Sequence, residues 1–298
     1  MKIYTTTHFE VARQTRAYFN FGNKNISIEK FEDGEALVSL PEAVINENVV
    51  LIQALTAPVN DSIMLTLFVL EALKAACAKT VLLVLTYLAY ARQDRQTRAR
   101  SITTCAVVCK MLSAYNIRKV YVLEPHSLQA VGFFNVPSSS FELVSAICEH
   151  ISRACALEDV IIIAPDQGAV DRAAKAAQVL GVDMLIGHKL RLKSQLKLAF
   201  QRQSKFKNKT GIIIDDVVNR GKSTSSTASE LAAKLGIKRI LIYCVHAVLS
   251  EGQLKFVEIT ASNSIPHRKY SIDLTYTLSR IIKRALANKP HDELLQTR

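Results

Sequence analysis

The sequence predicts an α/β protein in which mostly parallel sheets are covered by helices. Short apolar runs recur without polar alternation, as expected for parallel strands that are buried on both faces. Helical stretches lie between these runs, and strand-helix alternation of this kind places ligands outside the carboxyl ends of the strands. A polar break near the middle separates two comparable series. This organisation indicates two domains of similar build.

Six apolar runs are the predicted strands: Val49–Gln53, Thr80–Thr86, Lys119–Glu124, Asp159–Asp166, Thr210–Asp216 and Arg239–Val248. The predicted helices between them cover residues 61–78, 101–116 and 168–181, and Gly181 is the expected stop signal of the last one. The break is the segment 132–140, which contains a proline and three serines. The expected domains are therefore 1–141 and 142–298, each long enough for an ordinary hydrophobic core.

Composition narrows the classes of partner. The chain carries 38 basic and 26 acidic residues, a formal charge of +12, without a basic patch interleaved with aromatic residues. A polyanionic partner is favoured, and phosphorylated small molecules qualify as readily as nucleic acid. The six cysteines show no zinc-ligand spacing and are expected to be reduced and buried. No apolar signal core or uninterrupted apolar span is evident, so we expect a cytoplasmic protein without a membrane partner.

The stretch Gly211–Ser226 places two adjacent acids, Asp215 and Asp216, after a buried strand. At the carboxyl edge of a parallel sheet we expect both to point into a crevice, where carboxylates accept hydrogen bonds from sugar hydroxyls or hold hydrated magnesium. The amides of the following helix would bind a phosphate. A P-loop is excluded because Asp216 stands where its first glycine is required. The ordinary alternative is a solvated strand end.

The strand, paired acids, loop and helix resemble the sugar-phosphate loop of phosphoribosyltransferase-like folds. Further motifs occur in the order and spacing of the ribose-phosphate pyrophosphokinases, the PRPP synthetases, and this resemblance covers nearly the whole chain. The motifs are Phe31–Glu35, Pro58–Asp61, Tyr90–Arg95, His126, Gln129, Gly132–Phe134, Pro165–Gly168 and Lys189–Arg191. The resemblance implies two domains of phosphoribosyltransferase type, each a Rossmann-like, mostly parallel sheet flanked by helices.

The resemblance also implies an activity. Such enzymes transfer the pyrophosphoryl group of MgATP to the 1-hydroxyl of ribose 5-phosphate, giving PRPP and AMP for nucleotide biosynthesis, and assemble from dimers into homo-hexamers. The implied partners are ATP and ribose 5-phosphate, and the implied cofactor is Mg²⁺. Displacement at a phosphorus surrounded by negative oxygens requires positioning and charge neutralisation more than a protein nucleophile. Cations and Mg²⁺ should therefore dominate the site.

Carried over by position, the motifs assign residues to roles. At the ATP site, Phe31, Asp33 and Glu35 would meet the adenine across a dimer interface, with Arg92, Gln93 and Asp94 nearby. The metal would be held by His126 and Asp166, and catalytic charge would come from His126, Lys189 and Arg191, the last two on a mobile loop. Ribose 5-phosphate would be held by Asp215, Asp216, Asn219, Arg220, Gly221, Lys222, Ser223 and Thr224.

Seen alone, each motif also has an ordinary interpretation. The basic triplet at Lys189 is commonly a solvated face, and a lone histidine such as His126 is commonly a hydrogen-bonded loop residue. Asp166 suits a turn, residues 92–95 suit a helix-start cluster of ion pairs, and Phe31 suits a packed aromatic. The shared order of the motifs is what favours function.

The chain departs from the family pattern at three places, one of which is Arg100-Ser101-Ile102, where the family has Arg-Glu-Pro. Asn219 and Arg220 stand where the family has an acid and a threonine, and Glu124-Pro125 stands where it has Asp-Leu. A second hypothesis is therefore a weak or inactive homologue that binds nucleotide or sugar phosphate and co-assembles with an active paralogue. A phosphoribosyltransferase explains only Asp215 and Asp216, and nucleic-acid binding explains only the charge.

Overall fold

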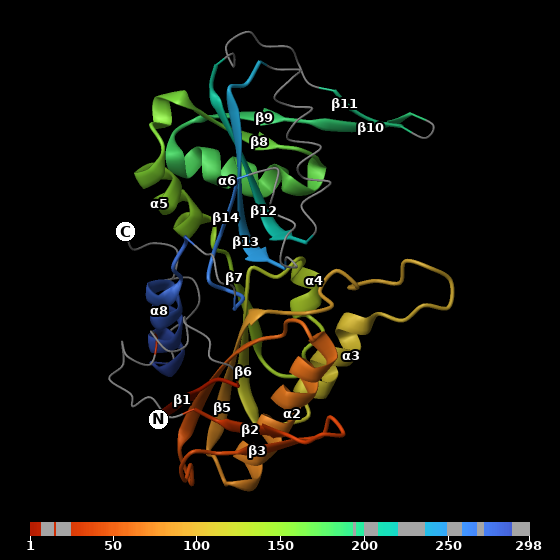
Figure 1. The fold of residues 1–298 in the computed structure, drawn as a ribbon, viewed down its shortest axis with the longest axis vertical. Helices are drawn as coiled ribbons and strands as arrows, with labels where there is room; N and C mark the ends of the chain where they lie inside the picture. Colours follow the sequence, from red (N-terminus) through yellow and green to blue (C-terminus); the bar gives the residue numbers. More distant parts are fainter. Residues whose placement is uncertain are drawn as a thin grey trace. The chain divides into compact units, whose positions relative to one another are not determined.

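The computed structural model describes residues 1–6, 15, 25–192, 195–199, 208–219, 236–248, 258–266 and 271–287, with 188–192 and 195–199 described by their backbone. These residues contain two five-stranded sheets and two antiparallel ribbons, and all strand pairs within the five-stranded sheets are parallel (Figure 1). The predicted α/β class with two mostly parallel sheets is confirmed. None of the described helices is long and apolar enough to cross a membrane.

The first sheet has the strand order β1-β4-β5-β6-β7. Its strands are β1 (Lys2–Tyr4), β4 (Asn48–Ala54), β5 (Thr80–Tyr87), β6 (Ile117–Leu123) and β7 (Ser138–Phe141). The helices of this region are α2 (Val59–Ala75), α3 (Thr104–Leu112) and α4 (Leu128–Val131), and a ribbon is formed by β2 (Ser27–Lys30) and β3 (Ala36–Ser39). The central strands contribute fully buried side chains such as Leu51, Leu83 and Val120, so the sheet is anchored by the hydrophobic effect.

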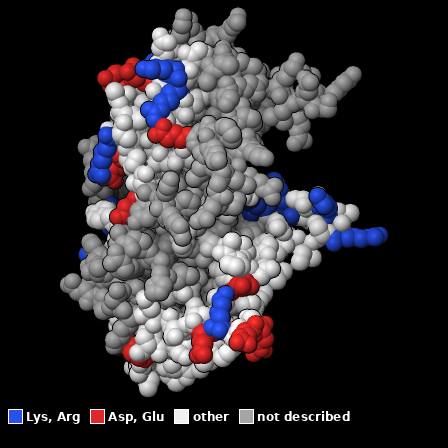
Figure 2. Space-filling view, in the orientation of Figure 1, with Lys and Arg blue, Asp and Glu red and all other residues white. Residues whose placement is uncertain are grey.

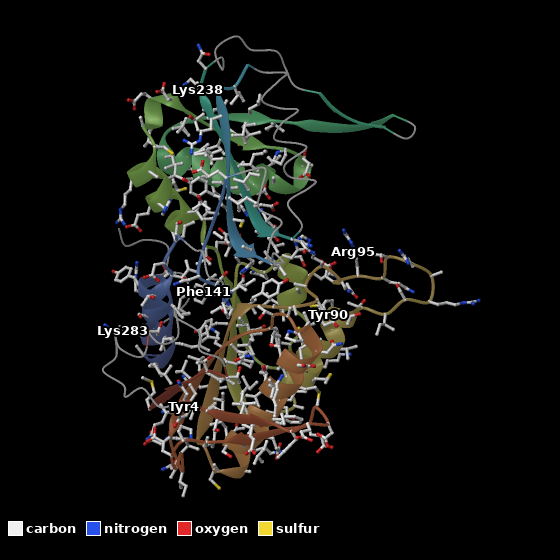
Figure 3. All side chains as sticks on the ribbon, viewed as in Figure 1. Tyr4, Tyr90, Arg95, Phe141, Lys238 and Lys283 are labelled. Carbon is white, nitrogen blue, oxygen red and sulfur yellow. The ribbon has the colours of Figure 1, made fainter. Side chains whose placement is uncertain are left out.

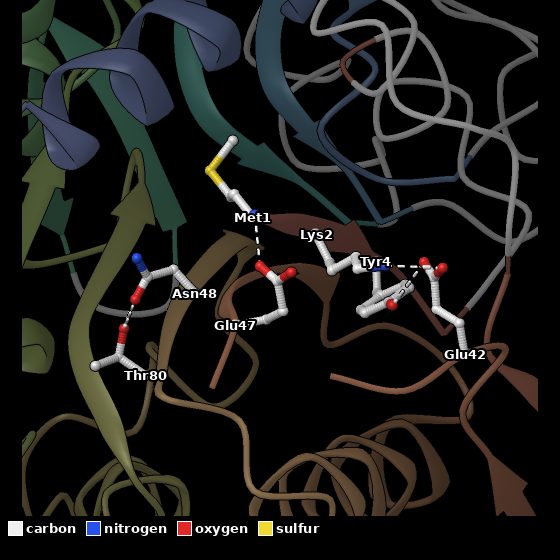
Figure 4. A network of polar contacts seen from close by, with 7 residues as sticks. All are labelled: Met1, Lys2, Tyr4, Glu42, Glu47, Asn48 and Thr80. Atoms are coloured by element: carbon white, nitrogen blue, oxygen red, sulfur yellow. Dashed lines mark hydrogen bonds and ion pairs between the residues drawn. The ribbon is translucent and has the colours of Figure 1, made fainter. Parts of the chain in front are cut away.

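Polar contacts hold the first strand at the edge of this sheet. The terminal amino group bonds Glu47 at 2.7 Å, and the Lys2 ammonium lies 2.8 Å from Glu42 (Figure 4). The buried Tyr4 hydroxyl also donates to Glu42, at 3.2 Å. Burial and the Glu42 charge raise the pKa of Tyr4, so the phenol stays protonated. A three-residue strand is too short to hold its register by ladder hydrogen bonds alone, and these contacts supply the rest.

The second sheet has the order β14-β13-β12-β8-β9. Its strands are β8 (Val160–Ala164), β9 (Asp183–Ile186), β12 (Thr210–Val218), β13 (Arg239–Ala247) and β14 (Ile259–Ala261). Helices α5 (Val144–Ala154) and α6 (Val170–Leu180), with the short 3-10 turns η1 (Leu157–Asp159) and η2 (Gln167–Ala169), belong to this region. The second ribbon is formed by β10 (His188–Leu192) and β11 (Gln195–Ala199), and α8 (Thr275–Leu286) is the last described helix.

In the second sheet β12 and β13 end together, whereas β8 ends about four residues earlier. Ile213 of β12 pairs with Ile163 of β8 and with Ile242 of β13. A Cβ added at Gly211 would lie 2.6 Å from the Ile163 side chain, so glycine permits close packing at this point. Because these strands are parallel, the carboxyl ends of β8, β12 and β13 lie at the same edge of the sheet, where sheets of this kind bind ligands.

All six predicted strands are confirmed, with changes at their ends. β12 continues past Asp216 to Val218, because two further valines pair with β13. Part of the predicted polar break forms β7, an edge strand paired with β6, a position in which serines are tolerated. Gly181 ends α6 with a φ of 66°, as predicted. The short edge strands were not predicted, because three or four residues give little periodicity.

The chain divides into two compact units. The first unit is Met1–Phe141 with Asp273–Arg298, and the second unit is Glu142–Ile272. The helix α8 is thereby grouped with the first unit. The assignment of the functional domains to 1–141 and 142–298 stays a prediction. Among the cysteines, Cys105, Cys109, Cys148 and Cys244 are buried, whereas Cys155 is half-buried and Cys77 is exposed; the expectation of burial is wrong for Cys77, which follows the end of α2 with a φ of 57°.

Candidate functional site

Two adjacent aspartates lie near the carboxyl end of β12. The Asp215 side chain is 36% exposed, whereas that of Asp216 is 8% exposed. That both carboxylates point into a crevice stays a prediction, and the Asp216 side chain is buried. Asp215 alone of the pair presents a substantially accessible carboxylate.

A residue that the sequence did not single out completes this cluster. Arg172 of α6 places Nη1 4.0 Å from Asp215 Oδ1 and Nη2 3.8 Å from Asp216 Oδ1, with 16% of its side chain exposed. One signal for it existed in the sequence. A cation in the first turn of a helix is repelled by the positive end of the helix dipole. An arginine at this position therefore suggests an acidic partner outside the helix that outweighs the repulsion.

The cluster perturbs the titration of Asp215. Burial raises the pKa of this carboxyl to about 7, and the hydrogen bond and charge of Asp216 act in the same direction, while Arg172 opposes them. Near neutral pH Asp215 is therefore present in both protonation states. In either state its oxygens can accept a hydrogen bond from a hydroxyl group.

Asp166 lies at the same edge of the second sheet, two residues after β8. Its Oδ1 accepts from the Gly168 amide at 3.1 Å and caps the 3-10 turn that precedes α6. The described residues contain no group of three or more His, Cys, Asp or Glu side chains that could hold a metal ion. The predicted metal pair draws His126 from the first unit and Asp166 from the second, and stays a prediction.

Of the remaining predicted residues of the second unit, the structure describes some and leaves others outside the described residues. Lys189 and Arg191 occupy alternate positions of β10, opposite Leu198 and Leu196. The expected loop is therefore replaced by a ribbon, whose alternation of polar and apolar residues has the period of a strand. Asn219 follows β12 and is exposed. The rest of the predicted sugar-phosphate loop, Arg220, Gly221, Lys222, Ser223 and Thr224, lies outside the described residues.

In the first unit, the segment 92–95 follows β5. The amide of Gln93 donates to the Tyr90 carbonyl at 2.7 Å, and its own carbonyl accepts from the Cys105 amide at 3.3 Å. The Thr104 hydroxyl donates to Gln93 Oε1 at 2.8 Å. Gln93 is thus fixed against the start of α3, which leaves the neighbouring Arg92 side chain exposed at the surface.

His126 lies beside this segment through its neighbour in sequence. The Ser127 hydroxyl donates to Asp94 Oδ2 at 2.6 Å, so the turn after β6 and the segment after β5 are joined. Glu124 is buried, has a φ of 38°, and donates its amide to the Phe141 carbonyl at 2.7 Å. His126 itself is exposed. The structure therefore joins the predicted ATP-binding segment 92–95 to the turn that carries His126.

Positive charge gathers on the same part of the first unit. Four arginines, Arg92, Arg95, Arg98 and Arg100, are exposed between β5 and α3. Figure 2 shows blue surface over this projecting segment, and Figure 3 labels Tyr90 and Arg95 at its start. Asp94, which is mostly buried, lies 3.9 Å from Arg95 Nε through its Oδ1, so one carboxylate faces this group of four arginines. Such a segment attracts polyphosphate groups.

Phe31, Asp33 and Glu35 lie at the tip of the β2-β3 ribbon. The Glu35 amide donates to Asp33 Oδ1 at 3.0 Å, and the Phe31 amide donates to the Glu35 carbonyl at 2.9 Å. Gly34 adopts a φ of 93°, which only glycine takes readily. This rigid turn leaves the Phe31 side chain 46% exposed, an orientation suited to contact with another molecule.

Comparisons with known proteins agree with this architecture. Residues 1–115 match the N-terminal domain of ribose phosphate pyrophosphokinase. The ribose-phosphate pyrophosphokinase of Bacillus caldolyticus is 32% identical over 261 residues, 85% of this chain and 82% of that protein. The chain belongs to the ribose-phosphate pyrophosphokinase family. Ribose-phosphate pyrophosphokinase 2 of Enterococcus faecalis is also 32% identical, over 91% of this chain and 88% of its own length.

The family membership extends to the fold. The crystal structure of phosphoribosylpyrophosphate synthetase from Mycobacterium smegmatis has a TM-score of 0.86 to this chain, at 24% identity, and the match covers 97% of this chain and 99% of that one. The two sheets described above are thus the ribose-phosphate pyrophosphokinase fold, with phosphoribosyltransferase-like sheets. The sugar-phosphate and ATP-side assignments stay predictions.

Proposed function

We propose that this chain is a ribose-phosphate diphosphokinase that transfers pyrophosphate from MgATP to the 1-hydroxyl of ribose 5-phosphate. The observation that carries the proposal is the acidic cluster at the edge of the second sheet, where Asp215 and Asp216 share Arg172. Family membership at about one-third identity supports the reaction. The proposal extends to a cytoplasmic homo-oligomer built from dimers into a hexamer.

Ribose 5-phosphate binds at the second sheet in this proposal. The accessible Asp215 carboxylate accepts hydrogen bonds from the sugar hydroxyls, and Arg172 keeps it close to the buried Asp216. Asn219 offers an amide beside them. The 5-phosphate is held by Arg220, Gly221, Lys222, Ser223 and Thr224, where a guanidinium clasps phosphate oxygens bidentately and an ammonium adds a point charge.

ATP binds at the first unit in this proposal. The exposed arginines beginning at Arg92 neutralise the triphosphate, and Gln93 and Asp94 shape the segment that carries them. The adenine contacts the ribbon tip formed by Phe31, Asp33 and Glu35, whose aromatic ring offers a stacking surface. The exposed arginines and the exposed Phe31 support this assignment, in which the ribbon tip of one protomer meets the adenine across a dimer interface.

Magnesium fits the donor set. Asp166 would supply a hard oxygen ligand of the kind that Mg²⁺ prefers, and His126 is the other predicted ligand. Because the described residues offer few protein ligands in one place, substrate phosphates and water would complete the coordination. When bound, the ion neutralises charge on the phosphoryl oxygens.

The chemistry requires charge stabilisation rather than a protein nucleophile. The 1-hydroxyl oxygen of the sugar attacks the β-phosphorus of ATP, the bond from that phosphorus to the α,β-bridging oxygen breaks, and AMP leaves while the hydroxyl proton is released. Lys189, Arg191 and His126 supply positive charge or hydrogen bonds to the transferring group. The experiment is a measurement of AMP and PRPP formation across magnesium and phosphate titrations. AMP should require both substrates, and its absence under all conditions would overturn the proposal.

A second candidate is a regulatory homologue that binds nucleotide or sugar phosphate without turnover and co-assembles with an active paralogue. It is favoured by the exposed Asn219, which lacks the charge of the family's acid. Reverting Asn219→Asp with Arg220→Thr separates the candidates. Activity should stay level or fall if the natural loop works, whereas a rise in activity together with copurification of a paralogue would support the regulator.

A further inference from the structure

The bond between Asp94 and Ser127 is a part of the first unit that the proposed chemistry leaves unexplained. The Ser127 hydroxyl donates to Asp94 Oδ2 at 2.6 Å, and Ser127 Oγ accepts from the Ala130 amide at 3.3 Å. Asp94 is only 9% exposed. A buried carboxylate needs such a partner, because an unpaired charge in the interior is costly. One serine side chain thus ties the segment after β5 to the start of α4.

His126 lies between two fixed points of the backbone. On one side Glu124 is buried and holds a φ of 38° while its amide donates to Phe141. On the other side Ser127 holds Asp94 and caps α4. A left-handed φ is unfavourable for a glutamate, so contacts at the ends of this turn maintain its shape. Loss of the Ser127 contact therefore frees the backbone that presents His126.

The backbone on the Asp94 side of the Ser127–Asp94 hydrogen bond is also held by contacts. Its neighbour Gln93 is bonded to Tyr90, Thr104 and Cys105. The segment 92–95 is thus a rigid support, and the turn 124–127 is held to it by a short charge-assisted hydrogen bond. A change in this bond moves the turn relative to the exposed Arg92.

We propose that Asp94 and Ser127 are positioning residues that hold the His126 turn in register with the segment that carries Arg92. Asp94 acts on the nucleotide through Ser127 rather than by touching it. The inference rests on the proposed function, in which this edge receives ATP. If His126 acts on the transferring group, the loss of its position lowers kcat more than it raises the KM for ribose 5-phosphate, which binds the second unit.

The test uses a matched set of variants of the full chain. Ser127→Ala removes the donor, Ser127→Thr keeps it, and Ser138→Ala removes a different hydroxyl that anchors the other end of α4 by donating to the Val131 carbonyl at 3.0 Å. We expect S127A to lower kcat about tenfold, since misplacement of a catalytic group by a fraction of an ångström has effects of this order. S127T should recover most of that loss, and S138A should stay within about twofold of the unmodified chain.

Coupling between the two positions is measured by adding Asp94→Asn and the double variant. If the residues act as one unit, D94N with S127A is no slower than the slower single variant. Equal kcat losses in S127A and S138A would overturn the inference, because they would show a general loosening of α4. So would full additivity of the two changes.

Hydrogen exchange separates this inference from the proposed function. S127A should speed amide exchange in both 90–95 and 124–131, whereas S138A should affect only the residues around 131. If the unmodified chain forms no AMP, the proposed reaction fails while the exchange result still decides the link. Unchanged exchange in 90–95 on S127A substitution would overturn the link even in an active enzyme.

Discussion

In the first unit four exposed arginines lie in the segment between β5 and α3, whereas at the edge of the second sheet two carboxylates share one largely buried arginine. In the first unit Asp94 is buried and bonded to a neutral hydroxyl, and the arginines around it face solvent. In the second unit Asp216 and Arg172 are both mostly covered. The first unit therefore presents a cationic segment, whereas the described residues at the second edge include more carboxylates than cations.

The difference shows how each edge can bind a phosphorylated molecule. An exposed cationic segment lowers the free energy of a highly charged triphosphate by Coulomb attraction, which salt screens. A compensated acidic cluster cannot attract an anion strongly. It instead offers fixed oxygens to neutral hydroxyl groups, while the charge for a single phosphate is left to the adjoining loop. This contrast favours the nucleotide at the first edge and the sugar at the second.

The largest expected effect comes from removing the shared cation. Arg172→Met leaves two neighbouring carboxylates without their shared cation. We therefore expect the free energy of unfolding to fall by about 2–4 kcal/mol, which is close to the cost of removing one partner from a buried ion pair. Affinity for ribose 5-phosphate should fall about 100-fold, because the acceptor geometry is lost. Urea unfolding and calorimetry measure the two quantities. Unchanged values in both would show that the arginine does not organise this edge.

A smaller effect is expected from packing beneath the second edge. Gly211→Ala places a methyl group 2.6 Å from the buried Ile163 side chain, which must shift, at a cost of about 1–2 kcal/mol in the free energy of unfolding. Because the methyl group adds no charge, the affinity for ATP at the first edge should stay constant. A stabilised variant would contradict the tight contact between β8 and β12.

The pH dependence of stability distinguishes the edges without a change in packing. Burial raises the folded pKa of Asp215 to about 7, from an unfolded value of about 4. The contribution of Asp215 to the free energy of unfolding is therefore fully present below a pH of about 4 and is lost as the pH rises through about 7. Asp215→Asn removes this dependence. The stability of the variant relative to the natural chain should therefore increase from pH 4 to pH 8, as about five urea titrations across that range would show. A constant difference would contradict the raised pKa.

The smallest effect is expected from an exposed pair on the same helix as Arg172. Lys175 lies 2.6 Å from Glu142, and both side chains are about half exposed (52% and 49%). Lys175→Gln should lower the free energy of unfolding by less than about 1 kcal/mol, and added salt should reduce even that. This variant is the control for Arg172→Met, because it removes a positive charge from α6 away from the paired aspartates. A loss as large as that of R172M would assign the effect to α6 rather than to the cluster.

Much of the architecture could be predicted from local patterns. The unalternating runs such as Thr80–Thr86 and the left-handed Gly181 are confirmed, because burial on both faces and a helix stop each leave a mark within a few residues. The ribbon at Lys189 and Arg191 also carried such a mark in its polar and apolar alternation. There the structure shows a two-stranded ribbon at the position of the expected loop, and the expected mobility stays a prediction.

The candidate sites depended more on contacts between distant residues. Asp94 and Ser127 are 33 positions apart, and Arg172 is 43 positions or more from the aspartates that it joins. In each pair the aspartates were predicted from the sequence, but Ser127 and Arg172 were not. Side-chain pairing follows from strand order and register, which the linear pattern does not contain. The exposure of Asp215 and the burial of Asp216 likewise depend on where β12 ends.

The sequence by itself determined the α/β class, the order of the central strands along the chain and the candidate residues, because periodicity and residue type are local properties. The tertiary structure decided which carboxylate is accessible, which arginine compensates it and which serine holds the His126 turn. Those outcomes depend on burial and on distances of a few ångströms between segments far apart in the chain, since electrostatic and hydrogen-bond energies are set by separation and solvent exposure.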